Sequence, residues 1–322
     1  MQIDTQTRHP SSLAARRVRP AGASAYPDFF VIGAQKCGTT TLYGLLRQHP
    51  DVFLPEQKEL HYFAADDRPP AFADAAATEL NQTTVWQRHA YQALYAATTA
   101  RFKGEICPTY LYAPQAAARI AKARPDARII AILRDPVARS FSAYRHMKAR
   151  GGEPAATFAE ALQAEPGHIA QHWQIMAHYT AASLYAPQLQ RYYDHFPRDQ
   201  ILILDFEDLK RDPIGTANRV LAFIGAGPLP RGAKIAQTNR TVVLKSGFLG
   251  HLLVQKPAWV RRMKKVIPQR LRWRLQSWLM SRLPAEEERL TPEDRARLAP
   301  LFHADMVQTR ALTGLPFGSW SA

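Results

Sequence analysis

A short glycine-bracketed segment carries the side chains that most clearly could do chemistry. It spans residues 29–41, reads FFVIGAQKCGTTT, and holds Lys36 together with three consecutive threonines. A lysine can bring a positive charge to an anion, and the backbone N–H groups of a glycine turn at a helix start bind phosphate. We therefore expect phosphate chemistry here. The alternative is an ordinary strand–turn–helix that binds nothing.

The spacing of this segment is similar to the nucleotide-binding pattern G-x-x-x-x-G-K-[ST], with one displacement. Gly33, Gly38 and Thr40 are in register, but Thr39 occupies the lysine position and the lysine lies inside the loop, at Lys36. A lysine after the second glycine reaches β- and γ-phosphates that Mg²⁺ bridges. Lys36 would instead lie over a shorter anion at the helix tip. The segment thus predicts that a phosphate compound binds here, but not which compound it is.

A second segment of similar character, RIIAILRDPVARSFSAY, spans residues 128–144. Arg134 ends an apolar run, Asp135 is a candidate helix N-cap and Pro136 suits the first helical position. Ligands of open α/β sheets bind at the carboxyl ends of the strands, so we expect Arg134 at the same edge as the glycine turn. Ser142 lies further along the same helix. A surface arginine and a packed serine are the alternative.

Apolar runs provide the strands that must position these loops. The expected strands lie near residues 29–33, 104–106, 129–133 and 201–205. Short continuous apolar runs are typical of strands buried in a parallel sheet. After the first run, Leu42, Leu45 and Leu46 recur at helical spacing. The sequence therefore predicts an α/β fold with a mainly parallel central sheet flanked by helices.

Together the two segments resemble the sulfotransferases that use 3′-phosphoadenosine 5′-phosphosulfate (PAPS), especially the heparan-sulfate-type and bacterial carbohydrate members. The first segment is similar to their K-x-G-T-T loop for the 5′-phosphosulfate. The second is similar to their R-D-P-x-x-R-x-x-S-x-Y site for the 3′-phosphate. The similarity continues at residues 49–63, 104–111 and 183–213 and reaches LTGLPFGSW near the C-terminus. The resemblance implies a P-loop-like donor site and PAPS as the sulfuryl donor. We expect no metal, since a sulfuryl group carries less negative charge than a terminal phosphoryl group and the sequence shows no His/Asp/Glu cluster with ligand spacing near the loop.

The resemblance also implies a set of donor-binding residues. They are Lys36, Cys37, Gly38, Thr39, Thr40, Thr41, Arg134, Ser142, Lys245 and Ser246. The last two lie in QTNRTVVLKS, where the family places a final loop over the donor. This loop lacks the Gly- and Cys-bearing form of the animal enzymes, so a surface lysine is the alternative for Lys245.

A carboxylate or an imidazole is needed to take the proton of an acceptor hydroxyl, and KELHYF at residues 58–63 offers both. Glu59 matches the glutamate that serves as the base in the family's E-x-H-F-F segment, so the resemblance favours it. The unperturbed pKa of histidine suits the task, which favours His61. A solvated loop carboxylate is the alternative for Glu59. Lys58 could orient the acceptor or the leaving phosphate, or could simply be solvated.

Glu105, in GEICP, is a further candidate for contact with the acceptor. At the next position animal members of the family often carry a lysine that assists catalysis, whereas this chain has Ile106. Lys36 is therefore expected to stabilise the leaving group alone. Glu105 could equally hold the Lys36 loop or be structural.

Length and composition limit the architecture. A chain of 322 residues with 46% hydrophobic content can form one large α/β domain or two smaller ones. We expect residues 1–27 to be a disordered arm and residues 28–322 to be a single domain. Cys37 and Cys107 do not make a disulfide scaffold or a zinc site. Because no apolar run approaches the length that spans a bilayer, we expect a cytoplasmic enzyme.

Positive charge is concentrated late in the chain. Between Asp212 and Glu286 there are fourteen Lys or Arg residues and no acidic residue, against a formal net charge of +15. Such a segment attracts anions, including PAPS, an acidic glycan, nucleic acid or an anionic membrane. Apolar stripes within residues 249–283 predict basic helices that either pack on the enzyme or lie on a membrane surface or an acidic glycan.

These observations favour in-line transfer of a sulfuryl group from PAPS to an acceptor hydroxyl, with Glu59 as the base and a carbohydrate as the acceptor that the resemblance implies. Lipid, phenolic and peptidyl hydroxyls stay open, because residues 64–103 and 145–182 show no readable motif. A P-loop-type small-molecule kinase is the main alternative, with ILILD at 201–205 as a Walker-B-like strand. A nucleic-acid-binding module built on the basic segment explains neither phosphate motif.

Overall fold

The computed structural model describes residues 25–65, 67–68, 70–235, 243–244, 285–286 and 289–320. Nearly all of the expected N-terminal arm lies outside these ranges. The basic segment at 249–283 and the candidate donor-binding residues Lys245 and Ser246 also lie outside them. The predictions for these parts of the chain therefore stay predictions.

A five-stranded, all-parallel sheet forms the centre of the molecule. Its strands are β1 (Phe29–Gly33), β2 (Val52–Phe53), β3 (Phe102–Ile106), β4 (Arg128–Leu133) and β5 (Ile201–Asp205). The spatial order is β2-β3-β1-β4-β5. Phe29 lies opposite both Gly104 and Arg128, so β1 is paired on both sides. Its central place explains why its sequence is a continuous apolar run. The expected parallel sheet is confirmed, with β2 as an added edge strand.

Helices connect the strands and cover the sheet. The α-helices are α1 (Thr39–Leu46), α2 (Thr78–Thr83), α3 (Arg88–Ala96), α4 (Ala116–Ala123), α5 (Pro136–Ala149), α6 (Phe158–Ala170), α7 (Tyr185–Tyr193), α8 (Phe206–Arg211), α9 (Pro213–Ile224) and α13 (Pro292–Thr313). Short 3₁₀ turns are η1 (Ala75–Ala77), η2 (Ile175–Ala177), η3 (Ala181–Ser183) and η4 (Arg198–Gln200). A small antiparallel pair joins β6 (Val243–Leu244) to β7 (Ala285–Glu286).

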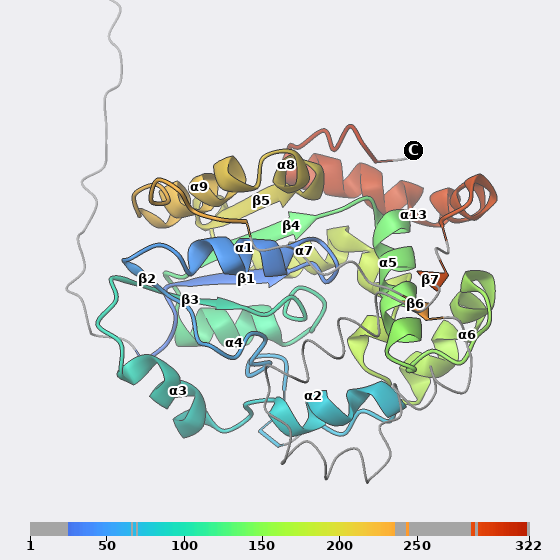
Figure 1. The fold of residues 1–322 in the computed structure, drawn as a ribbon, viewed down its shortest axis with the longest axis horizontal. Helices are drawn as coiled ribbons and strands as arrows, with labels where there is room; N and C mark the ends of the chain where they lie inside the picture. Colours follow the sequence, from blue (N-terminus) through green and yellow to red (C-terminus); the bar gives the residue numbers. More distant parts are fainter. Residues whose placement is uncertain are drawn as a thin grey trace, which may run out of the picture.

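Figure 1 shows α1 in front of the sheet and α7 behind it, so helices cover both faces. On the front, α1 packs against α9, and α9 also contacts β4 and β5. On the back, α7 packs against both α4 and α13. Within the described residues, no helix is long and apolar enough to cross a bilayer.

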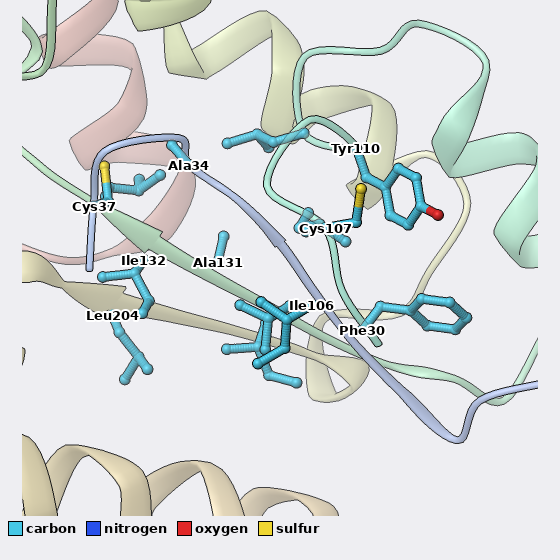
Figure 2. Close-up of a cluster of buried hydrophobic side chains, with 14 of the residues drawn as sticks. Phe30, Ala34, Cys37, Ile106, Cys107, Tyr110, Ala131, Ile132 and Leu204 are labelled. Atoms are coloured by element: carbon cyan, nitrogen blue, oxygen red, sulfur yellow. The ribbon is translucent and has the colours of Figure 1, made fainter. Parts of the chain in front are cut away.

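The core runs along the sheet. Phe29, Phe30, Val31 and Ile32 of β1 are fully buried. Figure 2 shows side chains of neighbouring strands gathered around β1, with Ile106, Ala131, Ile132 and Leu204 among those labelled. The helical stripe of α1 at Leu42, Leu45 and Leu46 is buried as its spacing predicts.

The folded part begins slightly earlier than expected. Tyr26, assigned above to the disordered arm, packs its ring against Phe63 and Tyr91 at centroid distances of 6.2 and 6.0 Å. Burial of an aromatic ring is a strong reason for the chain to be ordered at that point. The boundary of the expected arm therefore belongs before Tyr26 and not after residue 27.

A buried carboxylate attaches helix α13 to the start of helix α7, which covers one face of the sheet. Asp305 of α13 accepts hydrogen bonds from the backbone N–H groups of Tyr185 and Ala186, at 2.8 and 2.9 Å, where α7 begins. The first N–H groups of a helix lack partners within the helix, so this carboxylate satisfies two of them. The Tyr185 hydroxyl then donates to the carbonyl of Arg134 at 2.9 Å. The C-terminal helix thereby supports the loop that follows β4.

Candidate active site

The glycine turn after β1 has the conformation that its sequence predicts. Gly38 is the N-cap of α1 and has φ of 81°, in the left-handed region that favours glycine. A Cβ at this position would lie 2.6 Å from Leu209 Cδ2. Both the backbone angle and the space therefore require glycine.

The start of α1 presents donors to the surroundings. Among the described residues, the backbone N–H groups of Gly38, Thr39 and Thr40 donate no hydrogen bond, and the first turn of the helix carries no acidic side chain. Unpaired N–H groups and the positive end of the helix dipole favour a bound anion. The predicted phosphate-binding geometry is present in the backbone itself.

Lys36 lies over this turn in a strained conformation, with φ of 67°. Its Nζ atom is 3.3 Å from Nδ1 of His146. Burial, with the nearby charges of Arg134 and Arg139, lowers the pKa of Lys36 from 10.5 to about 8. Within the described residues no carboxylate forms an ion pair with it. Lys36 is thus a partly buried cation that, among the described residues, has no carboxylate in ion-pair contact, although the charge of Glu59 acts to raise its pKa.

The second segment brings Arg134 to the same place. Asp135 caps α5 by accepting from Ala138 N–H at 2.7 Å, and Pro136 is the first helical residue, as expected. Arg134 Nη1 donates to the Lys36 carbonyl at 3.3 Å, and its guanidinium lies over the Phe206 ring at 4.7 Å. The structure therefore brings the two predicted phosphate segments into direct contact.

Ser142 and Arg139, on the same helix, differ in what they can offer a ligand. Ser142 is half-buried, and its hydroxyl has no hydrogen-bond partner among the described residues. Arg139 is fully buried. It donates to the carbonyls of Gln35, His178 and Tyr179 at 3.1–3.3 Å. Arg139 therefore holds chain segments together, whereas Ser142 keeps an available hydroxyl.

Glu59 stands beside the start of α1. Lys58 Nζ pairs with Glu59 Oε1 and lies 3.5 Å from Thr39 Oγ1, so Lys58 links the carboxylate to the helix start. Burial acts to raise the pKa of Glu59, but the charges of Lys58 and His61 and the Lys58 hydrogen bond outweigh it, and this pKa lies below its ordinary value. Glu59 is therefore ionised at neutral pH and able to accept a proton.

His61 is the deeper of the two candidate bases. Its Nδ1 atom is 2.9 Å from Thr109 Oγ1, and its Nε2 atom is 4.0 Å from Glu59 Oε2. Burial lowers the pKa of His61, so the ring is neutral at pH 7. Cys107 Sγ lies 3.6 Å from the same ring nitrogen. Thr109 therefore holds a neutral, buried ring next to the Glu59 carboxylate.

A pocket of about 300 Å³ opens beside Glu59. Its polar lining comes from Gln35, Lys58, Glu59, His61, Thr83, Thr84, Thr109, His146, Arg150 and Gln174. Burial lowers the pKa of His146 to about 4, so this ring is neutral and can accept a hydrogen bond from the Lys36 ammonium. A reacting hydroxyl in this pocket would have a carboxylate within the lining and the Lys36 loop next to it.

Glu105 does not line this pocket. Its side chain is buried, with only 1% exposure, and Tyr91 and Tyr110 donate their hydroxyls to its two carboxylate oxygens. Burial raises the pKa of Glu105 to about 7. These contacts match the structural alternative for Glu105, and we no longer assign it to acceptor contact.

Backbone strain marks the same region. In the described residues, five non-glycine positions have positive φ, and three of them are Lys36, Glu59 and His61. Such conformations cost free energy of about 1–3 kcal/mol each and persist where the surrounding structure holds them, often at functional sites. Three candidate residues therefore share a feature that the sequence motifs did not reveal.

The remaining predicted site residues differ in how far they are accessible to a ligand. Cys37 is buried with its thiol directed at the Gln35 carbonyl, so only its backbone could meet a ligand. Thr40 is exposed at the helix tip and Thr41 is half-buried. Asp205, the candidate Walker-B carboxylate, caps α8 by accepting from Glu207 N–H at 3.0 Å. In the described part of the chain, no three His, Cys, Asp or Glu side chains gather as possible metal ligands.

Sequence reasoning missed His146, Gln35 and Thr109. His146 follows Ser142 by four residues on α5, a spacing that places both on one helix face and could have suggested it. Gln35 and Thr109 reach the pocket from two different loops. Each lies inside a segment named above, residues 29–41 and 104–111, but nothing in those segments distinguishes these two side chains from their neighbours.

Comparison with known proteins gives one consistent result. A family model described as "Sulfotransferase family" matches residues 27–227. The chain is 30% identical over 210 residues to human bifunctional heparan sulfate N-deacetylase/N-sulfotransferase 3, covering 63% of this chain and 22% of that protein. It is 31% identical over 210 residues to mouse heparan sulfate glucosamine 3-O-sulfotransferase 3B1, covering 64% and 47%. The chain thus spans less than half the length of these curated relatives.

A solved structure is similar over nearly the whole molecule. The sulfotransferase from Alicyclobacillus acidocaldarius superposes with a TM-score of 0.70 at 30% identity, covering 92% of this chain and 98% of that one. The same fold therefore extends beyond the region that the family model matches.

Proposed function

Because the chain belongs to the sulfotransferase family, we propose that it transfers the sulfuryl group of PAPS to an acceptor hydroxyl by in-line displacement. Sulfuryl transfer is the activity of the family. PAPS as the donor and the class of the acceptor are proposed in addition.

The environment of the Lys36 ammonium is the main support for this proposal. The ammonium lies at a helix start with unpaired N–H groups, beside Arg134, and has no carboxylate partner in ion-pair contact among the described residues. A partly buried cation without an ion-pair partner is unfavourable until an anion arrives. A phosphosulfate on the turn, with a second phosphate near Arg134 and Ser142, would supply that anion.

Each residue then has a defined role. Glu59 takes the acceptor's proton while the acceptor oxygen forms its bond to sulfur. Lys36 and the N–H groups of the turn stabilise the charge left on the 5′-phosphate oxygen as its bond to sulfur breaks. His61 lines the same pocket as Glu59, with its Nε2 atom 4.0 Å from Glu59 Oε2. Lys58 keeps that carboxylate ionised and next to Thr39.

The names of the similar proteins support the acceptor class that we propose. Two of them are named for heparan sulfate, so a carbohydrate hydroxyl is the acceptor that we propose. Lipid, phenolic and peptidyl hydroxyls are the alternatives. A cytoplasmic location is also part of the proposal, and cell fractionation would test it.

Nucleotide binding tests the donor assignment directly. Adenosine 3′,5′-bisphosphate (PAP) should raise the melting temperature of the protein, whereas Mg-ATP should have little effect. The reverse result would favour a kinase.

The pH dependence of PAP binding sharpens that test. The affinity for PAP should fall as pH rises above about 8, because Lys36 then loses its proton in the free protein. Replacing Lys36 with Arg, which stays protonated, should remove this dependence. Affinity that is independent of pH in the wild type would contradict the role of Lys36.

A further inference from the structure

The pocket beside Glu59 has two chemically different ends. One end holds the candidate catalytic groups Glu59 and His61. The other end is mainly apolar, and its side chains come from the loop before α2, from α2 itself and from η2, with Thr83 and Gln174 as polar neighbours. The apolar side chains include Ala65, Pro70, Phe72, Leu80, Ile175 and Met176. Most of these side chains are only half-buried, so they face the space of the pocket.

The charges of the described lining residues do not suit a polyanion. Among these residues the cationic side chains are Lys58, whose ammonium is paired with Glu59, and Arg150. Glu59 is itself negative, and the ring of His146 is neutral at pH 7. Sites that recognise sulfate or carboxylate groups present several cations to them. Here apolar side chains outnumber the cationic ones.

The apolar end is a built structure. Asp74, at the start of η1, accepts from the backbone N–H and the side chain of Gln174, at 2.8 and 2.7 Å. Asn81 of α2 exchanges two hydrogen bonds of 3.0 Å with the backbone of Phe72. The first pair joins the Phe72 loop to the segment that carries Ile175, and the second pair joins it to α2. The two apolar walls are therefore tied together by hydrogen bonds of the protein itself.

We propose that the acceptor is an uncharged glycoside whose sugar hydroxyl meets Glu59 while an apolar alkyl or aryl aglycone fills the far end of this pocket. This inference rests on the proposed sulfuryl transfer and names its acceptor more narrowly. Removal of the aglycone from water is the driving force. The sugar hydroxyls lie at the polar end, where Thr109, Gln35 and Lys58 line the pocket.

A series of glucosides with one sugar and different aglycones tests the inference. Transfer from ³⁵S-labelled PAPS would be measured to methyl, phenyl and octyl β-glucoside and to a heparan sulfate oligosaccharide. The value of kcat/KM should rise about tenfold or more from the methyl to the better of the two apolar glucosides. The comparison of phenyl with octyl distinguishes an aryl from an alkyl aglycone.

Two pocket variants and one surface control locate the effect. Leu80→Asn and Met176→Gln keep the approximate size of the side chain but add a polar group. In each, the ratio of kcat/KM for the apolar glucoside to that for methyl glucoside should fall about tenfold. Leu301→Asn is the control, because Leu301 lies on α13 and is 58% exposed. It should leave the ratio unchanged.

The outcomes separate the inference from the proposed function. Equal kcat/KM for all glucosides, or a preference for the heparan sulfate oligosaccharide, would overturn the inference while confirming sulfuryl transfer. Absence of PAP binding and of transfer to any acceptor would overturn the proposed function. If PAP binds but no acceptor is sulfated, the inference is tested by measuring whether phenyl and octyl glucoside bind to the PAP-bound protein. Absence of that binding also overturns the inference.

Discussion

Two arginines and two glutamates, one of each near the candidate active site and one of each in the core, show how the same residue types serve different purposes. Arg134 makes one side-chain hydrogen bond, to the Lys36 carbonyl, and Glu59 keeps a 34% exposed side chain. Arg139 and Glu105 are buried, and protein groups occupy their donors and acceptors. Charged groups that the protein fully satisfies hold the fold, whereas partly satisfied ones are available to a ligand.

The largest expected effect is on turnover, at Glu59. Glu59→Gln keeps the size of the side chain but cannot take a proton at neutral pH, so turnover should fall by about 10²–10⁴. The dissociation constant for PAP should stay within about twofold. His61→Asn is the paired control and should cost less. Normal turnover in Glu59→Gln together with loss of turnover in His61→Asn would reverse the two roles.

The pH profile of the wild type tests the same assignment. The pKa of Glu59 lies below its ordinary value of 4.5, so the base is ionised above that pH. The rate should therefore rise with pH on an acid limb below about pH 4.5 and should lack that limb in Glu59→Gln.

The core arginine should matter for stability. Arg139→Met removes donors from the carbonyls of Gln35, His178 and Tyr179 and leaves them buried without these partners. The free energy of unfolding should fall by about 3–5 kcal/mol, measured by urea unfolding. Arg134→Met is the matched variant and should change it far less. Similar losses in both variants would remove the distinction between the two arginines.

Glu105 should make stability depend on pH with a defined sign. Its pKa is raised in the folded state from 4.5 to about 7. Its contribution is therefore fully present below pH 4.5 and is lost as pH rises through 7, a change of up to about 3 kcal/mol. The stability advantage of the wild type over Glu105→Gln should accordingly be larger at pH 5 than at pH 8. The pKa shift of Glu59 has the opposite direction, so Glu59→Gln should not reproduce this trend.

Arg134→Ala tests the arginine beside the Lys36 turn as a phosphate ligand. Binding of PAP and PAPS should weaken by about 1.5–3 kcal/mol, the value of a charge-assisted contact. Binding of adenosine 5′-phosphosulfate, which lacks the 3′-phosphate, should hardly change. Isothermal titration with both nucleotides provides the measurement, and equal losses would contradict the assignment of Arg134 to the 3′-phosphate.

Chelation should have the smallest effect. Treatment with EDTA should leave the rate unchanged, because a sulfuryl group carries less negative charge than a terminal phosphoryl group and Lys36 supplies a cation beside it. Loss of activity in EDTA with rescue by Mg²⁺ would indicate phosphoryl transfer, and the pocket would then have to be reconsidered as a kinase site.

The sequence could predict the strands and the phosphate turn because those features are local. A buried parallel strand is a continuous apolar run, and the Asp135 cap and the Gly38 turn follow from the residues at those positions. It could not separate Arg134 from Arg139, since one short motif contains both. Arg139 is buried by Gln35 and by the 178–183 segment, both distant from it in the chain.

The environment of the carboxylates is non-local for the same reason. The Tyr91 and Tyr110 hydroxyls reach Glu105 from α3 and from the loop after β3. The apolar end of the pocket is assembled from the Phe72 loop, α2 and η2. None of these contacts has a fixed spacing that a single sequence displays.

The contact between α13 and α7 means that the recognisable family segment is shorter than the unit that must fold together. The family match ends at residue 227, but Asp305 fixes the start of α7, and Tyr185 there supports the Arg134 carbonyl. A chain shortened to the matched segment would retain the Lys36 and Arg134 segments but lose the support behind Arg134, and with it the candidate donor-binding residues Lys245 and Ser246. The boundary that sequence similarity suggests, at residue 227, therefore separates α13 from the elements that it supports.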